Sequence, residues 1–317
     1  MTPPPARPTA TLPLTLSAEA ADARAHGRPV VALESTILAH GLPWPRNLEV
    51  ARQAEAVIRD QGAVPATIAV LDGRLHTGLD APSLERLARS AAPGAEPLRK
   101  LSRADLAHAL AAGTSGATTV AATMIGARAA GIEVFATGGI GGVHRGASDS
   151  WDVSADLHEL ARTPVTVVAA GAKAILDLPK TLEVLETLGV PVLGWRTHAF
   201  PAFWSHDSGL AAPLRVETAA EAARAHRLRA ALGLEGGQLL AVPIPAEAEI
   251  PPAALAPAIA AALSEAEAQG LTGKPVTPFL LSKVLEATQG ASLEANIALV
   301  LNNARVAAQV ACALAAD

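Results

Sequence analysis

The amino-acid sequence predicts an α/β fold in which helices cover both faces of a largely parallel sheet. Short apolar runs rich in β-branched residues alternate with longer segments of helical pattern. Such alternation is typical of parallel strands joined by crossover helices, and strands buried on both faces are continuously apolar. Half of the 317 residues are hydrophobic and only 17% are charged, which suffices for a large core. Two strand-like runs, 66–71 and 74–78, flank Asp72-Gly73, a favoured hairpin turn, so we expect a mixed sheet.

The other elements follow from local signals in chain order. Ser17 begins a short helix that ends at His26, and 29–35 is a buried strand followed by a Pro-rich loop. Asn47 is expected to cap a helix over 48–61. Further strands are expected at 132–136, 165–170, 190–194 and 238–242. Further helices are expected over 102–112, 117–130, 153–162, 179–188, 217–232, 251–268, 278–288 and 292–315.

We expect a single catalytic domain over residues 14–317. No linker-like stretch interrupts this segment and no internal repeat is visible. Residues 1–13 are rich in proline, a composition that predicts a disordered arm.

Composition excludes several classes of protein. The net charge is −5, aromatic residues make up 3%, and no long basic stretch occurs, so nucleic-acid binding is not expected. Cys312 is the only cysteine, which rules out an intrachain disulfide and a thiolate metal site. The N-terminus has no basic segment followed by an apolar core, and polar residues interrupt the apolar run 293–316. We therefore expect neither a secretory signal nor a membrane span, and a cytoplasmic location.

The most informative segment is 137–156, TGGIGGVHRGASDSWDVSAD. It has five glycines, and it follows the apolar strand predicted at 132–136. Ligands of open α/β sheets lie at the carboxyl ends of strands, so we expect a polar, anion-binding loop. Asp152 and Asp156 share one face if a helix begins near Ser150, and their oxygens suit Mg²⁺ or Mn²⁺. Acidic residues at a helix start also stabilise its dipole without any ligand.

Two strand ends carry reactive side chains. Glu34 ends the apolar strand VVALEST, where desolvation favours general acid–base chemistry, although it could equally pair with an arginine. Lys173 follows the strand at 165–170. A lysine in apolar surroundings can act as a Schiff-base nucleophile, although most lysines only pack their stems.

Several other polar residues are candidates for binding. Lys100 and Arg103 flank Ser102, a possible N-cap with Asp105 three residues later, an arrangement that suits a phosphate or a plain helix cap. His144 is a candidate hydrogen-bonding group in the glycine loop, whereas His40 could simply pack. GGIGG does not have the spacing of a dinucleotide-binding fingerprint, and no GxxxxGK[ST] motif is present.

Eight stretches of this chain occur in the same order in a known family. They are ALESTILAHGLPWP (32–45), GAVPATIAVLDG (62–73), KLSRADL (100–106), GATTVAATM (116–124), VFATGGIGGVHRG (134–146), WDVSADLHELARTPV (151–165), VVAAGAKAILDLPKTLE (167–183) and GKPVTPFLL…SLEANIALVLNNA (273–304). With these motifs, the sequence from about residue 29 resembles the pseudouridine-5′-phosphate glycosidase family, also known through indigoidine synthase A-like proteins.

The resemblance implies reversible cleavage of the C–C glycosidic bond of pseudouridine 5′-phosphate to uracil and ribose 5-phosphate, through a lysine imine. It implies that Glu34 is the acid, Lys173 the nucleophile and Asp152 the ligand of one Mn²⁺ per subunit. It assigns substrate contacts to Lys100, Val120, Ser154, Ala155, Asp156, His144 and Asn296, of which His144 and Asn296 are expected to face uracil. It also implies a three-layer α/β/α sandwich, assembled as a homotrimer.

Three alternatives stay open. A Schiff-base aldolase or lyase acting on another sugar phosphate would share the lysine and the phosphate site. A glycosidase for a different modified nucleotide would share the whole mechanism. A regulator that binds sugar phosphates would need no reactive lysine, and the chain shows no appended DNA-binding or partner-binding domain.

Overall fold

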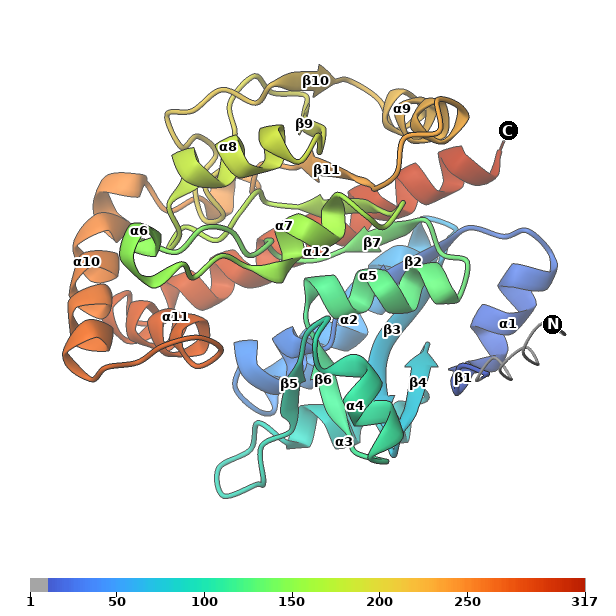
Figure 1. The fold of residues 1–317 in the computed structure, drawn as a ribbon, viewed down its shortest axis with the longest axis horizontal. Coiled ribbons are helices and arrows are strands. Elements are labelled where there is room, and N and C mark those ends of the chain that lie inside the picture. The colour runs from blue at the N-terminus through green and yellow to red at the C-terminus, as the bar shows by residue number, and fades with distance from the viewer. Residues whose placement is uncertain (1–10, 317) are drawn as a thin grey trace, which may run out of the picture.

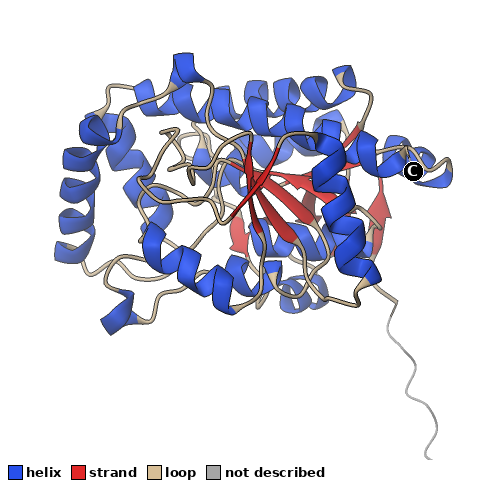
Figure 2. Cartoon of the chain, turned by 90° about the horizontal axis from the view of Figure 1, so that it is seen from above, coloured by secondary structure: helices blue, strands red, loops and turns tan. Residues whose placement is uncertain are grey.

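The computed structural model describes residues 11–316, and the first ten residues of the predicted arm lie outside this range. Within it, eleven strands form one mixed sheet with helices on both faces (Figures 1 and 2). The expected α/β/α sandwich with a largely parallel sheet is confirmed. The strands are β1 (Leu14–Leu16), β2 (Val30–Leu33), β3 (Val64–Leu71), β4 (Arg74–Thr77), β5 (Arg99–Leu101), β6 (Gly116–Thr118), β7 (Val134–Ala136), β8 (Thr166–Ala169), β9 (Val192–Trp195), β10 (Leu214–Val216) and β11 (Gln238–Ala241).

The sheet has the order β1-β4-β3-β2-β7-β8-β11-β9-β10, and β6, paired with β5, also pairs with β3. From β3 through β10 along this path every pairing is parallel. The antiparallel partners of β3 are β4, in the predicted hairpin, and β6. Parallel strands end at a common edge, so β2, β7 and β8 deliver the residues that follow them to one place.

The helices are α1 (Ala18–Ala25), α2 (Arg46–Asp60), α3 (Ala81–Arg89), α4 (Leu106–Ala111), α5 (Val120–Ala129), α6 (Ala147–Ser150), α7 (Ala155–Leu160), α8 (Leu178–Thr187), α9 (Ala219–Ala231), α10 (Pro252–Ala268), α11 (Val276–Ala287) and α12 (Ala291–Ala315). A π-turn, η1 (Ile37–Gly41), and a 3₁₀ turn, η2 (Ala246–Ala248), complete the set. The long red helix α12 runs along the sheet and packs on β7 and β8 (Figure 1).

Several predicted boundaries are wrong, because tertiary contacts compete with local signals. Helix α2 begins at Arg46, and Asn47 lies inside its first turn, donating to the carbonyls of Leu38 (2.6 Å) and Ala88 (2.8 Å). The expected helix over 117–130 starts only at Val120, since the preceding residues form β6. The sequence pattern did not predict helix α3, although Asp80 caps it by accepting a hydrogen bond from the Ser83 amide (2.9 Å).

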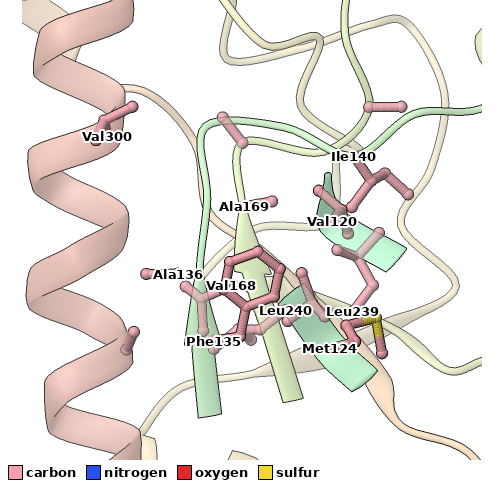
Figure 3. Close-up of a cluster of buried hydrophobic side chains, with 14 of the residues drawn as sticks. Val120, Met124, Phe135, Ala136, Ile140, Val168, Ala169, Leu239, Leu240 and Val300 are labelled. Carbon is pink, nitrogen blue, oxygen red and sulfur yellow. The ribbon is translucent and has the colours of Figure 1, made fainter. Parts of the chain in front are cut away.

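From composition we expected the run 293–316 to be too polar for a membrane span, and helix α12 corrects that expectation. Its most apolar window has a mean hydropathy of 1.5, so by length and composition it does qualify as a membrane span, despite its polar residues. More than half of that window (56%) is nevertheless buried inside the protein. Figure 3 shows Val300 projecting from this helix toward the strands that include Ala136 and Ala169. The helix is therefore part of the core.

The centre of the core is built from small aliphatic residues around one aromatic ring. Phe135 on β7 is fully buried, and Met124 and Val168 belong to the same cluster of buried side chains (Figure 3). We expect Phe135→Ala to lower the free energy of unfolding by about 3–5 kcal/mol, because it leaves a cavity that the sheet cannot close. Urea denaturation measures this, with the exposed Leu232→Ala as the control. A loss under about 1 kcal/mol would contradict close packing at this position.

Candidate active site

Three adjacent parallel strands bring the reactive residues to the carboxyl edge of the sheet. Glu34 follows β2 directly, Thr137 follows β7 directly, and Lys173 lies four residues beyond the end of β8. Strand β6 ends at the same edge, because the amide of its last residue, Thr118, donates a hydrogen bond to Ser35 Oγ (2.9 Å). The N-terminus of α5, which starts at Val120, therefore reaches the same edge.

A cavity of about 290 Å³ opens at this edge. The ten residues to which the family resemblance assigns catalysis, substrate or metal all lie on its wall: Glu34, Lys100, Val120, His144, Asp152, Ser154, Ala155, Asp156, Lys173 and Asn296. Their segments are spread over more than 260 residues of sequence. The fold therefore gathers the predicted site residues into one pocket of a size suited to a small ligand.

Lys173 is half-buried and held by paired loops. Its Nζ donates a hydrogen bond to the Gly139 carbonyl (2.6 Å) in the glycine loop. The Ile140 amide donates to the Gly171 carbonyl (3.1 Å), and the Lys173 amide donates to the Ile140 carbonyl (3.1 Å). Gly171 has φ of +71°, and a Cβ there would lie 2.4 Å from the Pro201 carbonyl oxygen. The loop that presents the lysine is thus fixed by its backbone.

Glu34 is held by two threonines that sequence reasoning missed. Thr36 Oγ1 donates to one carboxylate oxygen and Thr137 Oγ1 donates to the other. Both threonines are buried. A signal was present in the sequence, since Thr36 is two residues from Glu34 and Thr137 opens the glycine loop. However, only the pairing of β2 with β7 places Thr137 beside the Glu34 carboxylate.

Asp156 lies inside the wall of the cavity. Its two carboxylate oxygens accept hydrogen bonds from the Ala121 amide (2.9 Å) and the Gly141 amide (2.8 Å). A Cβ at Gly141 would lie 2.3 Å from Ser154 Oγ, so only glycine permits this approach. Ser154 caps α7. The Asp156 carboxylate therefore joins the start of α5 to the glycine loop.

The expectation that Asp152 and Asp156 share one helical face is wrong. Helix α6 ends at Ser150, Trp151 has a left-handed φ of 56°, and α7 starts only at Ala155. Asp152 therefore lies in the loop between two short helices, where its carbonyl accepts from the His144 amide (3.0 Å).

We expect Asp156→Asn to reduce both stability and activity. An asparagine amide turns an N–H₂ group toward one of the two backbone donors, which leaves a buried donor unsatisfied at a cost of about 1–3 kcal/mol. Urea denaturation and turnover measure the effect, with the exposed Asp149→Asn as the control. Wild-type stability of Asp156→Asn would show that these hydrogen bonds contribute little.

Basic side chains surround one part of the cavity. Burial, and then the charge of Lys173, lowers the pKa of Lys100. Burial and the charge of Lys100 lower the pKa of His40, and burial lowers the pKa of His144 against the opposing charge of Asp152. Lys274, from the segment before α11, donates to the Lys100 carbonyl (3.2 Å) and to Asp105 Oδ2 (2.6 Å). These groups suit an anionic ligand. His40, for which simple packing was one reading, lies on the cavity wall, and so does Lys274, which the sequence did not single out.

The phosphate site considered around Lys100, Ser102 and Arg103 is not formed as expected, because Arg103 is absent from the cavity wall. Arg103 forms an ion pair with the buried Glu159 (2.5 Å). Ser102 does not cap a helix; its amide donates to Asp105 Oδ2 (2.8 Å), and α4 starts only at Leu106. Of this basic pair, only Lys100 belongs to the cavity wall.

Asn296 contributes to the cavity wall from α12, far along the chain from the other site residues. Its Oδ1 is buried and has no hydrogen-bond partner among residues 11–316, and the same holds for His40 Nε2. Buried polar atoms are normally hydrogen-bonded. Two such atoms on residues of one cavity wall are therefore candidates for contacts with a polar ligand.

The side chains of the cavity wall supply only part of the coordination that a metal ion needs. Across residues 11–316, no cluster of three or more His, Cys, Asp or Glu side chains is placed to hold a cation. Asp152 lines the cavity, whereas the other wall carboxylates, Asp156 and Glu34, already accept hydrogen bonds from protein donors on both oxygens. Mg²⁺-like ions often bind through one or two carboxylates, several waters and substrate oxygens. The site thus suits an ion shared with a bound substrate rather than one enclosed by protein.

Known proteins share both the sequence and the length of this chain. Residues 19–313 match the family model described as indigoidine synthase A like protein. A protein from Jannaschia sp. (strain CCS1) named pseudouridine-5′-phosphate glycosidase is 66% identical over 304 residues, covering 96% of this chain and 99% of the relative. A protein of the same name from Paracoccus denitrificans is also 66% identical, over 95% of this chain and 98% of its own length.

Two solved structures share the fold. The prealnumycin C-glycosynthase AlnA, crystallised with ribulose 5-phosphate, is 40% identical, with a TM-score of 0.87 over 97% of this chain and 98% of its own. An indigoidine synthase A-like protein from Thermotoga maritima is 36% identical, with a TM-score of 0.86 over 96% of this chain and 97% of its own.

Proposed function

The chain belongs to the indigoidine synthase A-like family, and we propose that it is a pseudouridine-5′-phosphate glycosidase. It cleaves the C–C glycosidic bond of pseudouridine 5′-phosphate reversibly, giving uracil and ribose 5-phosphate. The observation that supports this most directly is the near-full-length identity of 66% to relatives of that name. The placement of Lys173 and Glu34 on one cavity wall agrees with it.

The chemistry explains why a lysine is needed. N- and O-glycosidases expel a leaving group through a heteroatom that a carboxylic acid can protonate. A C-glycoside has no such atom at its bond to the sugar, so C1′ needs an electron donor as uracil C5 leaves with the electrons of that bond. A lysine amine bonded to C1′ provides it, because its nitrogen can form a C=N bond as the base departs.

In the proposed sequence, Lys173 Nζ bonds to C1′ while the C1′–O4′ bond breaks, and Glu34 gives O4′ a proton. The C1′–C5 bond then breaks as the nitrogen forms an imine, and uracil C5 gains the proton that the adduct nitrogen loses. Water adds to the imine carbon, and the C–N bond breaks to give ribose 5-phosphate and free Lys173. Each proton taken up on carbon or oxygen comes from a group in the cavity.

We assign the ends of the substrate from the wall residues. Lys100, the Val120 backbone and the segment Ser154–Asp156 hold the sugar phosphate, where Asp156 acts by fixing the Gly141 amide. His144 and Asn296 face the uracil, and the unpartnered Asn296 Oδ1 is a suitable acceptor for a ring N–H. Burial holds His144 toward its neutral form by lowering its pKa, so it can both donate and accept.

One observation favours a second candidate. The solved C-glycosynthase with 40% identity was crystallised with ribulose 5-phosphate, a different five-carbon sugar phosphate. A Schiff-base lyase or glycosidase acting on another sugar phosphate or modified nucleotide would use the same lysine and the same anionic pocket.

Uracil release tests the proposal. Purified protein with Mn²⁺ is incubated with pseudouridine 5′-phosphate, and uracil and ribose 5-phosphate are quantified by chromatography. Equimolar release supports the assignment, with uridine 5′-phosphate as the N-glycoside control. No release from pseudouridine 5′-phosphate, with turnover of another C-glycoside or sugar phosphate, would favour the second candidate.

We further propose that the enzyme binds one Mn²⁺ per subunit through Asp152, works as a cytoplasmic homotrimer, and binds neither nucleic acid nor membranes. The ion would supply positive charge for the oxygens of the bound substrate. We expect EDTA to lower activity by at least about tenfold, since metal contacts of this kind contribute several kcal/mol. Added Mn²⁺ should restore it in wild type but not in Asp152→Ala. Full activity in EDTA would remove Asp152 from this role.

A further inference from the structure

Two hydroxyl groups from different strand ends converge on Glu34. Thr36 Oγ1 donates to Glu34 Oε2, and Thr137 Oγ1 donates to Oε1. The exposed fractions of the two threonines are only 9% and 3%. A hydroxyl has a single hydrogen to donate, so each threonine commits its donor to the carboxylate. We call Thr36 and Thr137 the hydroxyl pair.

The hydroxyl pair is held in place by its own backbone contacts. The Thr137 amide donates to the Val168 carbonyl (3.0 Å), and its carbonyl accepts from Asn303 Nδ2 (2.8 Å) on α12. Asn303 is fully buried. On the other side, Ser35 Oγ donates to the Ile68 carbonyl (2.7 Å), which fixes the residue between Glu34 and Thr36. The backbone that carries each hydroxyl is therefore fixed beside Glu34.

Hydroxyl donors on both oxygens match a carboxylate, whose oxygens only accept hydrogen bonds. A protonated carboxyl group would have to direct its own O–H at one of the two hydroxyl hydrogens or force that hydroxyl to turn. Cationic residues of the cavity wall also suit a negatively charged side chain. They are Lys100, Lys173 and Lys274, with His40 and His144 when protonated. The acidic wall residues Asp152 and Asp156 oppose them, but the Asp156 oxygens are already taken by two amides.

We propose that Thr36 and Thr137 are positioning residues that hold Glu34 as an oriented carboxylate in the free enzyme, so that Glu34 accepts a proton before it donates one. This inference rests on the proposed function. The ammonium of Lys173 must lose a proton before its nitrogen can bond to C1′, and the Glu34 carboxylate takes that proton. Glu34 then gives it to O4′ as the C1′–O4′ bond breaks. One proton moves from nitrogen to oxygen, and the resting carboxylate is restored.

The test compares isosteric removal of each hydroxyl with its conservative replacement. Thr36→Val and Thr137→Val delete the donors at nearly constant volume, whereas Thr36→Ser and Thr137→Ser keep them. Thr166→Val is the matched control: Thr166 is fully buried at the start of β8, and its hydroxyl contacts His226 and Gln238. Uracil release from pseudouridine 5′-phosphate is measured from pH 4 to 9, and kcat and kcat/KM are plotted separately.

We expect each valine variant to move the acid limb of the kcat/KM profile up by about one pH unit, the scale of a hydrogen bond to a charged group. The double variant should move it further, with kcat lowered more than KM is raised. The serine variants and Thr166→Val should keep the wild-type acid limb. A purely structural role would lower activity at every pH and leave the limb unmoved.

The outcomes separate this inference from the proposed function. If the wild type is active and the acid limb stays in place in both valine variants, the positioning role of the hydroxyl pair is overturned. The proposed function is then unaffected. A wild type that releases no uracil overturns the proposed function, and this inference with it. Should Thr137→Val fail to fold, the acid limb of Thr36→Val decides the question, because Thr36 lies outside the strands and its hydroxyl contacts Glu34.

Discussion

Lys173→Ala is expected to lower turnover of pseudouridine 5′-phosphate by roughly 10⁴-fold or more, the scale seen when a covalent nucleophile is removed. The reason is chemical: an amine bonded to C1′ must form the C=N bond as uracil C5 leaves with the electrons of the C1′–C5 bond, and the proposal gives that role to Lys173. Of the other wall lysines, Lys100 comes from β5 and Lys274 is paired with Asp105 (2.6 Å). Uracil release by purified variants measures the loss.

The covalent role has a direct readout. Incubation with ribose 5-phosphate and borohydride should reduce the imine and add the sugar phosphate irreversibly to Lys173, detected by peptide mass spectrometry. Lys173→Arg keeps the positive charge but cannot form the imine, so it should bind substrate and give no adduct. Lys180, exposed and paired with Asp177 (2.8 Å), is the internal control lysine. An adduct at Lys180 or Lys100 with none at Lys173 would refute the covalent assignment.

Glu34→Gln should have the second largest effect, a loss of about 10²–10⁴-fold in kcat with little change in KM. Glutamine keeps the shape of the side chain but can neither accept nor deliver the proton that ring opening requires. Glu55→Gln is a matched control, because Glu55 is another partly buried glutamate that accepts from a threonine, Thr67 (2.9 Å), and it lies outside the cavity wall.

A partial reaction separates the two residues. The open-chain aldehyde of ribose 5-phosphate needs no ring opening, so Glu34→Gln should still form the borohydride-trapped adduct at a pH high enough for solvent to deprotonate Lys173. Lys173→Ala should form none at any pH. Wild-type turnover in Glu34→Gln would show that Glu34 does not act at ring opening, and loss of trapping at that pH would show that its role is not confined to proton transfer.

Local patterns single out two candidate reactive residues but misplace some of the elements around them. Glu34 and Lys173 stand out because each ends an apolar, β-rich run, and the carboxyl ends of parallel strands share one edge. The predicted start of α5 is wrong, since Gly116–Thr118 has no strand signal of its own and becomes β6 only by pairing with β3 and β5. Short strands of this kind depend on partners that periodicity does not reveal.

The sequence by itself determined the alternation of strands and helices, the glycine loop at a strand end, and the choice of Glu34 and Lys173 as candidate reactive residues. Those features depend on hydrophobic periodicity and residue chemistry, which are local. Only the tertiary structure decided that Thr137 holds Glu34, that Asp156 binds two backbone amides, and that Arg103 pairs with Glu159. Each of these contacts joins segments 15–103 residues apart, and such distances close only when the sheet is assembled.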